Sequence, residues 1–117
     1  MPDDRLIALA DRLQATCLAR GLTVATAESC TGGLVGHALT SIPGASSYYL
    51  GGLITYADAL KRDLAGVPAE VLETHGAVSA QVAIAMAEGV RDRIGADVAV
   101  SVLAVSQTGD GKNTRLL

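Results

Sequence analysis

Apolar and polar residues alternate with a helical period near the N-terminus of this 117-residue chain. Four apolar side chains fall on one stripe: Leu6, Ala10, Leu13 and Cys17. This spacing predicts an amphipathic helix, which Asp3 or Asp4 can cap and which Gly21 can end. Residues 22–27, which follow, are predicted to form the first strand.

The next stretch predicts a helix and a second strand. Apolar residues at helical spacing run from Leu34 to about Leu39, and the turn-forming sequence at 42–46 stops this helix. Residues 48–56 are aromatic and β-branched apart from one glycine pair, which favours a strand. At Gly51 and Gly52 we expect a bulge or a close backbone approach.

Three helices and a third strand are predicted in the second half. Residues 57–64 and 68–74 form short helices, with Pro68 in a favoured starting position. Ser79 can cap the strongest amphipathic segment, whose apolar residues recur at helical spacing: Val82, Met86, Val90 and Ile94. Residues 97–105 are almost continuously apolar, which is typical of a strand covered on both faces.

Helices between strands predict an α/β fold with helices on both sides of a sheet. We predict one domain over residues 1–105 with only three strands, followed by a polar, glycine-bearing tail, 106–117, without strand or helix period. An apolar last strand needs a neighbour, because an open hydrophobic edge invites association. Either another chain covers that edge or the domain ends early.

Composition narrows the classes of function. Half of the residues are apolar, and the net charge is −3 without a basic block, which argues against a nucleic-acid partner. The N-terminus is too acidic for a signal peptide, and no apolar run reaches membrane-spanning length, so a cytoplasmic protein without a membrane partner is expected. The two cysteines, Cys17 and Cys30, have no companions at metal-binding spacing.

The segment 27–33, Ala-Glu-Ser-Cys-Thr-Gly-Gly, carries the main chemical signal. It places Ser29 on a predicted strand-to-helix turn, where a hydroxyl projects from the sheet edge beside unpaired backbone N–H groups. This arrangement suits a nucleophile with an oxyanion hole, or a phosphate-binding site. The alternative is an ordinary helix cap with flexible glycines. The spacing matches neither a P-loop nor a dinucleotide fingerprint.

Five motifs in order identify a resemblance: residues 26–33, 43–46, 52–56, Lys61 followed by 66–68, and 75–79. Together they resemble the CinA C-terminal domain family, the PncC type of nicotinamide mononucleotide amidohydrolase. The likeness runs from the first helix through Val102. It implies a three-layer α/β/α sandwich with a mixed, mainly parallel sheet, and a cytoplasmic homo-oligomer that acts in NAD metabolism on a mononucleotide without metal or cofactor.

The resemblance also implies residue roles. Ser29 is the nucleophile, Lys61 its base and Tyr56 a neighbour that positions or assists it. Cys30, Thr31, Gly32 and Gly33 contact the substrate, as oxyanion donors or as phosphate ligands. Neither histidine has a partner carboxylate at a sheet edge, and a serine–lysine pair is a known substitute for the serine–histidine–aspartate triad.

Other interpretations of these residues stay open. Lys61 on a short helix is compatible with a solvated charge, and Tyr56 with a core residue at a strand end. Glu28 is either an orienting carboxylate or a salt-bridge partner. The family continues with a [Ser/Thr]-Gly-Ile-Ala-Gly-Pro loop and further strands, whereas residues 103–107 here read Leu-Ala-Val-Ser-Gln. The rival function is a non-catalytic module that binds a phosphate ligand or associates with itself.

Overall fold

A parallel sheet organises the fold. The computed structural model describes residues 3–107 and 113–116, and for 104–107 and 113–116 it describes the backbone only. Strands β1 (Val24–Glu28), β2 (Tyr49–Ile54) and β3 (Val98–Val102) pair in the order β2-β1-β3, and both pairings are parallel. The predicted α/β class is confirmed, but this sheet is parallel throughout and not mixed.

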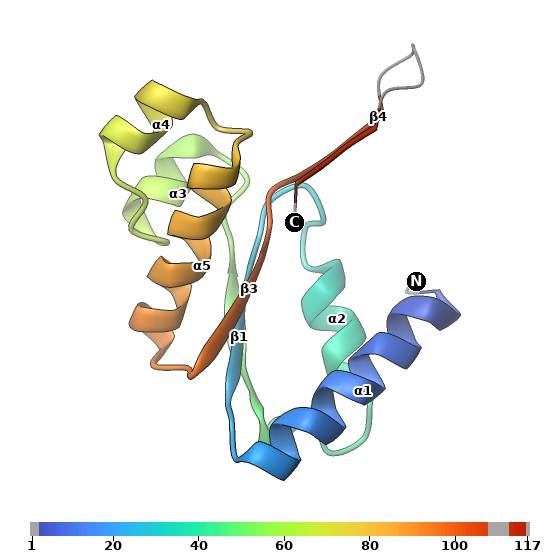
Figure 1. Ribbon diagram of the computed structural model, residues 1–117. Coiled ribbons are helices and arrows are strands. Elements are labelled where there is room, and N and C mark those ends of the chain that lie inside the picture. Colours follow the sequence, from blue (N-terminus) through green and yellow to red (C-terminus); the bar gives the residue numbers. More distant parts are fainter. Residues whose placement is uncertain (1–2, 108–112, 117) are drawn as a thin grey trace.

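Helices cover both faces of the sheet (Figure 1). On one face lie α1 (Asp4–Arg20) and α2 (Leu34–Thr40). On the other, α5 (Ala80–Ile94) packs on the strands, with α3 (Asp58–Asp63) and α4 (Ala69–His75) on the same side. A short 3-10 turn, η1 (Ala45–Ser47), precedes β2. The layered arrangement predicted from the order of elements is therefore present.

The central strand β1 is buried along its whole length. Its small side chains let helices approach from both sides: Ala25 and Ala27 join the α5 core with Val82 and Met86. Val24 faces the opposite core, whose other members include Ala10, Cys17 and Tyr48. Burial of these apolar groups is the main stabilising contribution to the fold.

The two long helices begin and end where the sequence predicts. The Asp3 carboxylate accepts a hydrogen bond from Leu6 N at 2.8 Å, and Gly21 ends α1 in the left-handed region at φ 65°. The Ser79 hydroxyl accepts from Val82 N at 3.2 Å. Each cap satisfies an N–H group that the first turn of a helix leaves unpaired.

The glycine pair in β2 serves both expected purposes. The β1–β2 register shifts between Val24 and Ala25, which pair with Tyr49 and Gly51, so one extra residue is accommodated there. A Cβ on Gly52 would lie 2.2 Å from Thr26 Oγ1. Only glycine permits this approach of two backbones.

Strand β3 differs from its prediction. It lies at an edge of the sheet, and Val98 and Val100 are each 37% exposed, so it is not covered on both faces. The predicted strand is also interrupted at Leu103. The last bond between β3 and the β1 segment is the one from Ser29 N to Val102 O, and because β1 ends at Glu28, the chain leaves the sheet at this point.

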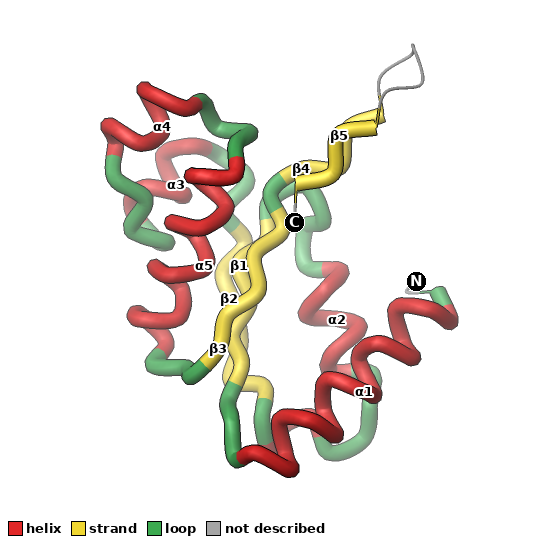
Figure 2. The backbone as a smooth tube through the Cα atoms, viewed as in Figure 1, coloured by secondary structure: helices red, strands yellow, loops and turns green. Residues whose placement is uncertain are grey.

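Two further strands follow β3, and they extend into the polar tail. β4 (Ala104–Gln107) pairs antiparallel with β5 (Asn113–Leu116), and Figure 2 shows this ladder extending from the end of β3. The sequence of the tail shows no strand period, but ladder hydrogen bonds use backbone groups and do not require an apolar pattern. The rest of the tail, 108–112 and 117, lies outside the described residues. No helix in the described part of the chain combines the length and apolar character needed to cross a membrane.

Candidate functional site

Ser29 lies at the carboxyl edge of the sheet, directly after β1. Its backbone N–H donates to Val102 O at 2.9 Å, and the carbonyl of the preceding Glu28 accepts from Thr55 N at 2.8 Å. The side chain is only 6% exposed, and its hydroxyl forms no hydrogen bond to any described residue. All three strands thus hold the backbone at Ser29, while its hydroxyl is left available for chemistry.

The turn after Ser29 presents backbone donors. Gly32 N donates to Ser29 O at 3.2 Å and Leu34 N to Thr31 O at 3.1 Å. The N–H groups of Cys30, Thr31 and Gly33 form no hydrogen bond within the described part of the chain. Such donors can stabilise an oxyanion or hold a phosphate.

Both glycines of this turn adopt backbone conformations that other residues rarely take. Gly32 has φ 62° and Gly33 φ 114°. These angles turn the chain from β1 into α2 within a few residues. The glycines predicted to contact substrate are therefore also required by the shape of the turn.

Glu28 is an orienting carboxylate. Its side chain is buried, and Oε1 accepts from Thr31 Oγ1 and from Val35 N, both at 2.8 Å. Oε2 accepts from Gly36 N at 3.0 Å. Among the described residues no lysine or arginine forms an ion pair with it. Of the two alternatives left open by the sequence, the salt bridge is excluded for this part of the chain.

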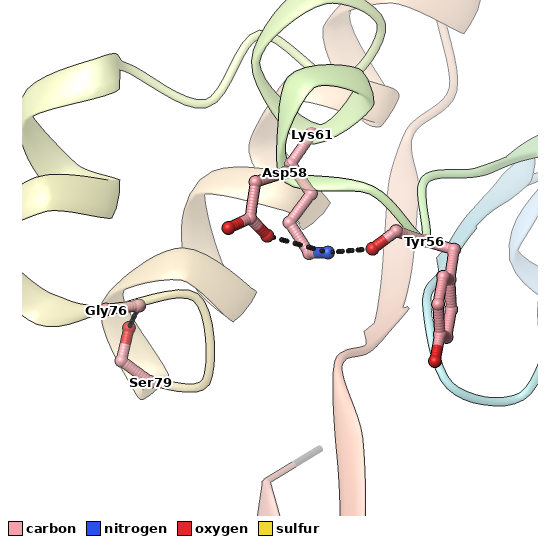
Figure 3. Close-up of polar contacts among 5 residues, drawn as sticks. All are labelled: Tyr56, Asp58, Lys61, Gly76 and Ser79. Carbon is pink, nitrogen blue, oxygen red and sulfur yellow. Dashed lines mark hydrogen bonds and ion pairs between the residues drawn. The ribbon is translucent and has the colours of Figure 1, made fainter.

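Lys61 is a buried residue. It lies on α3 with 3% of its side chain exposed, and Nζ donates to Tyr56 O at 2.7 Å (Figure 3). Asp58 Oδ1 lies 3.5 Å from the same nitrogen. The alternative of a solvated surface charge is wrong. These two neighbours leave the third direction at the nitrogen without a partner among the described residues.

Tyr56 reaches Lys61 through its backbone and not through its ring. The residue follows β2, its side chain is 74% exposed, and Figure 3 shows the ring directed away from the Lys61 ammonium. The alternative of a core residue at a strand end is therefore wrong. The phenol stands at the rim of the candidate site, exposed to solvent.

The fold brings the backbone segments of Ser29, Tyr56 and Lys61 to one sheet edge, but the serine hydroxyl and the lysine amine do not contact each other through a hydrogen bond. Ser29 and Tyr56 directly follow neighbouring strands, which the bond between Thr55 N and Glu28 O links at that edge. Lys61 reaches the Tyr56 carbonyl from α3. No hydrogen bond connects Ser29 Oγ with Lys61 Nζ.

Sequence reasoning missed two residues beside the site. Thr55 is fully buried, and its hydroxyl has no hydrogen-bond partner among the described residues. Asp58 contacts Lys61 from one helical turn earlier. An acid three residues before a lysine on a predicted helix is a recognisable signal for such a pair. Nothing in the sequence distinguishes the Thr55 hydroxyl from that of an ordinary strand threonine.

A cavity between α4 and α5 lies away from this edge. It has a volume of about 480 Å³ and is lined by residues of α4, α5 and the segment before α4. Neither Ser29 nor Lys61 lines it, so its size does not bear on the serine chemistry. Within the described residues, no three histidine, cysteine or acidic side chains gather at metal-binding distances.

Comparisons with known proteins agree on one family. The family model of the CinA C-terminal domain matches residues 6–114, which is beyond the Val102 limit of the motif resemblance. A CinA-like protein of Parasynechococcus marenigrum is 50% identical over 95 residues, 81% of this chain and 23% of that protein. One from Gemmatimonas aurantiaca is 48% identical over 109 residues, 93% of this chain and 25% of that protein. The chain thus spans about a quarter of these relatives.

Solved structures show the same fold. The competence/damage inducible protein CihA of Agrobacterium tumefaciens is 43% identical with a TM-score of 0.82, covering 93% of this chain and 66% of its own. A competence-damaged protein (CinA) superfamily protein of Escherichia coli is 32% identical with a TM-score of 0.84, covering 96% and 66%. Part of each solved chain therefore has no counterpart here.

Proposed function

The chain belongs to the CinA C-terminal domain family, and from this premise we propose that it hydrolyses the carboxamide of nicotinamide mononucleotide to the acid and ammonia. One observation carries the proposal: a buried serine directly follows β1, a buried lysine of α3 contacts the segment that follows the neighbouring strand β2, and nearby backbone N–H groups have no partner among the described residues. An amide needs an activated nucleophile and a site for the developing oxyanion, and this edge holds candidates for both.

The proposed reaction has two stages. In its neutral amine form, Lys61 takes the Ser29 proton on its lone pair as Oγ attacks the carboxamide carbon, and the N–H groups of Cys30 and Thr31 receive the oxyanion. The C–N bond then breaks, Lys61 returns the proton to the leaving ammonia, and an ester remains on Ser29. Water, deprotonated by Lys61, attacks that ester, which frees the acid and restores the serine hydroxyl.

The contacts of Lys61 support its part in this scheme. As a neutral amine, Lys61 directs one N–H group to Tyr56 O and the other to Asp58 Oδ1, and its lone pair occupies the third direction. Proton transfer requires that this direction meet Ser29 Oγ. The long, flexible stem of lysine allows that adjustment, whereas the serine is fixed by the strands on both sides.

The test is ammonia release from nicotinamide mononucleotide, with the acid product identified by mass. The wild-type chain is expected to release ammonia, and Lys61→Met to lose at least about 100-fold in rate, since general acid–base catalysis contributes about 100- to 10,000-fold. Arg62→Met is the matched control, because the neighbouring Arg62 is exposed and, among the described residues, forms an ion pair with Asp63 alone. A wild-type chain without ammonia release, or equal loss in both variants, contradicts the proposal.

A second candidate function, self-association, is favoured by the outer edge of β3. Val98 N and Val102 O bond toward β1, so the alternating residues Ala99 and Ser101 direct their backbone groups away from the sheet. Residues 98–105 contain no charge and no proline. The other edge strand, β2, carries a bulge that disturbs pairing, whereas β3 is regular.

The proposed occupant of this edge is β3 of a second copy, in antiparallel pairing about a two-fold axis. Two identical uncharged edges meet there without like-charge repulsion. Light scattering after size exclusion is expected to give a dimer mass for the wild type and a monomer mass for Val100→Lys. The control Leu50→Lys alters a half-exposed residue of β2 and should leave the dimer intact. A monomeric wild type excludes this candidate.

A further inference from the structure

One buried carboxylate spans the turn that contains the nucleophile. Glu28 is the last residue of β1, and its oxygens bond to groups three, seven and eight residues later: Thr31 Oγ1, Val35 N and Gly36 N. These contacts connect the sheet to the first turn of α2 and enclose the segment from Ser29 to Gly33. With 3% of Glu28 exposed, water does not compete for these bonds.

Helix α2 depends on this carboxylate for its beginning. Its N-cap, Gly33, has no side chain to accept the N–H groups of the first turn. Glu28 accepts from Val35 N and Gly36 N instead, and its negative charge complements the positive end of the helix. A cap supplied from five residues upstream fixes the position of the whole connecting turn.

The space around the carboxylate is fitted to it. A Cβ at Gly36 would lie 2.9 Å from the Tyr49 hydroxyl and 3.4 Å from Glu28 Oε2. That hydroxyl is itself held by a 2.6 Å hydrogen bond to Thr26 Oγ1 on β1. These neighbouring groups restrict the conformation of the Glu28 side chain, so that each carboxylate oxygen faces its own donors.

We infer that Glu28 is a positioning residue for Ser29: its carboxylate holds the turn so that the serine hydroxyl and the N–H groups of Cys30 and Thr31 keep their relative positions. The inference rests on the proposed function, because it assigns Glu28 a part in that reaction. Glu28 does not touch the reacting atoms. Its effect comes through the backbone that carries them, and displacement by about 1 Å can reduce a rate about 100-fold.

The pattern of donors requires two acceptor oxygens. A glutamine at this position has a single oxygen, so its NH₂ group would face either Gly36 N–H or the pair formed by Thr31 and Val35. One contact is then donor against donor. An aspartate keeps both oxygens and the charge but is shorter by one methylene. Glu28→Gln should therefore disturb the turn more than Glu28→Asp.

The experiment compares Glu28→Gln and Glu28→Asp with Asp97→Asn. Asp97 is also a carboxylate that accepts a backbone N–H bond, from Thr23, but at the opposite end of β1. Three quantities are measured on each folded variant: kcat and KM for ammonia release, the rate at which a fluorophosphonate labels Ser29, and the midpoint of thermal unfolding. Labelling of an activated serine does not depend on recognition of the mononucleotide.

Glu28→Gln is expected to lose about 10- to 100-fold in kcat with KM within about 2-fold, and to lose labelling by a similar factor. Glu28→Asp should lose less kcat and less labelling than Glu28→Gln. Asp97→Asn should retain the wild-type kcat and labelling rate even if its unfolding midpoint falls. Wild-type rates of turnover and labelling in Glu28→Gln would overturn the inference. So would an equal loss in Asp97→Asn, which would indicate a general effect of stability.

Failure of the proposed function gives a different pattern. If the wild type labels at Ser29 without releasing ammonia, the amidase proposal fails, and the labelling rates of the Glu28 variants still decide the positioning role. If the wild type neither labels nor releases ammonia, both are overturned.

Discussion

Lys61 Nζ lies 2.7 Å from the backbone carbonyl oxygen of Tyr56. This bond places a buried nitrogen of α3 beside a residue that follows β2, although the Tyr56 ring itself lies in solvent. The carbonyl contact survives any substitution of the ring. Roles of the Tyr56 backbone and of its hydroxyl can therefore be separated by mutation.

Tyr56→Phe is expected to leave stability within about 0.5 kcal/mol of the wild type, because the ring is exposed and its hydroxyl makes no hydrogen bond within the described part of the chain. If the hydroxyl assists Lys61, as the family resemblance implies, ammonia release falls at least about 10-fold. Urea unfolding and initial rates measure the two effects. Unchanged rates would limit Tyr56 to its backbone contact.

Gly52→Ala should be strongly destabilising. The new Cβ would lie 2.2 Å from Thr26 Oγ1 and 2.6 Å from Thr26 O, and a backbone atom cannot move aside as a side chain can. We expect a loss of about 1–3 kcal/mol or more in the free energy of unfolding. Gly51→Ala is the comparison, since its Cβ meets nothing within 4 Å but its φ of 144° is unfavourable. A smaller loss for Gly52→Ala than for Gly51→Ala would refute the close approach.

Acid should weaken the link between β1 and β3 through Asp97. Its carboxylate accepts from Thr23 N at 2.8 Å and from Thr23 Oγ1 at 3.0 Å, and these bonds lower the pKa of Asp97. Since the folded pKa lies below the unfolded value of about 3.9, the contribution is complete above that pH and is lost as pH falls through the folded pKa.

Asp97→Asn tests this pH dependence. The variant should be less stable than the wild type at pH 7, and the difference should shrink below about pH 4 as the wild-type carboxyl is protonated. Thermal unfolding between pH 7 and pH 2 gives both curves. Parallel curves over the whole range would show that Asp97 does not contribute through its charge.

The two cysteines should differ in reactivity. Cys30 is exposed in the turn, whereas Cys17 is buried in α1, and burial raises the pKa of the Cys17 thiol. A thiol reagent is expected to modify one cysteine quickly, identified as Cys30 by peptide mass, and the second only on unfolding. Nicotinamide mononucleotide should slow the first reaction. Equal rates for both thiols would contradict the placement of Cys17.

Sequence reasoning succeeded where the signal is local. The caps at Asp3 and Ser79 and the glycine at 21 fix helix ends through contacts within a few residues, and the structure confirms them. Gly52 was recognisable because a glycine inside an apolar strand has few explanations. The position of Ser29 on a strand-to-helix turn follows from the same local rules.

It failed where the outcome depends on residues far apart in the chain. The exposure of β3 is set by strand order, which its own apolar sequence does not reveal. Burial of Lys61 depends on how α3 packs, and the outward ring of Tyr56 on where β2 ends. For Glu28 the sequence offered two roles, and only the positions of Val35 and Gly36 distinguished them.

The most direct test of the account compares Ser29→Ala with Cys30→Ala in ammonia release from nicotinamide mononucleotide. Both remove one heavy atom from adjacent residues of the same turn. Ser29→Ala should reduce the rate at least about 1,000-fold, as expected for the loss of a nucleophile, while Cys30→Ala, which keeps the backbone N–H group assigned to the oxyanion, retains most of it. Substantial turnover by Ser29→Ala, or a loss confined to Cys30→Ala, would contradict serine catalysis at this edge.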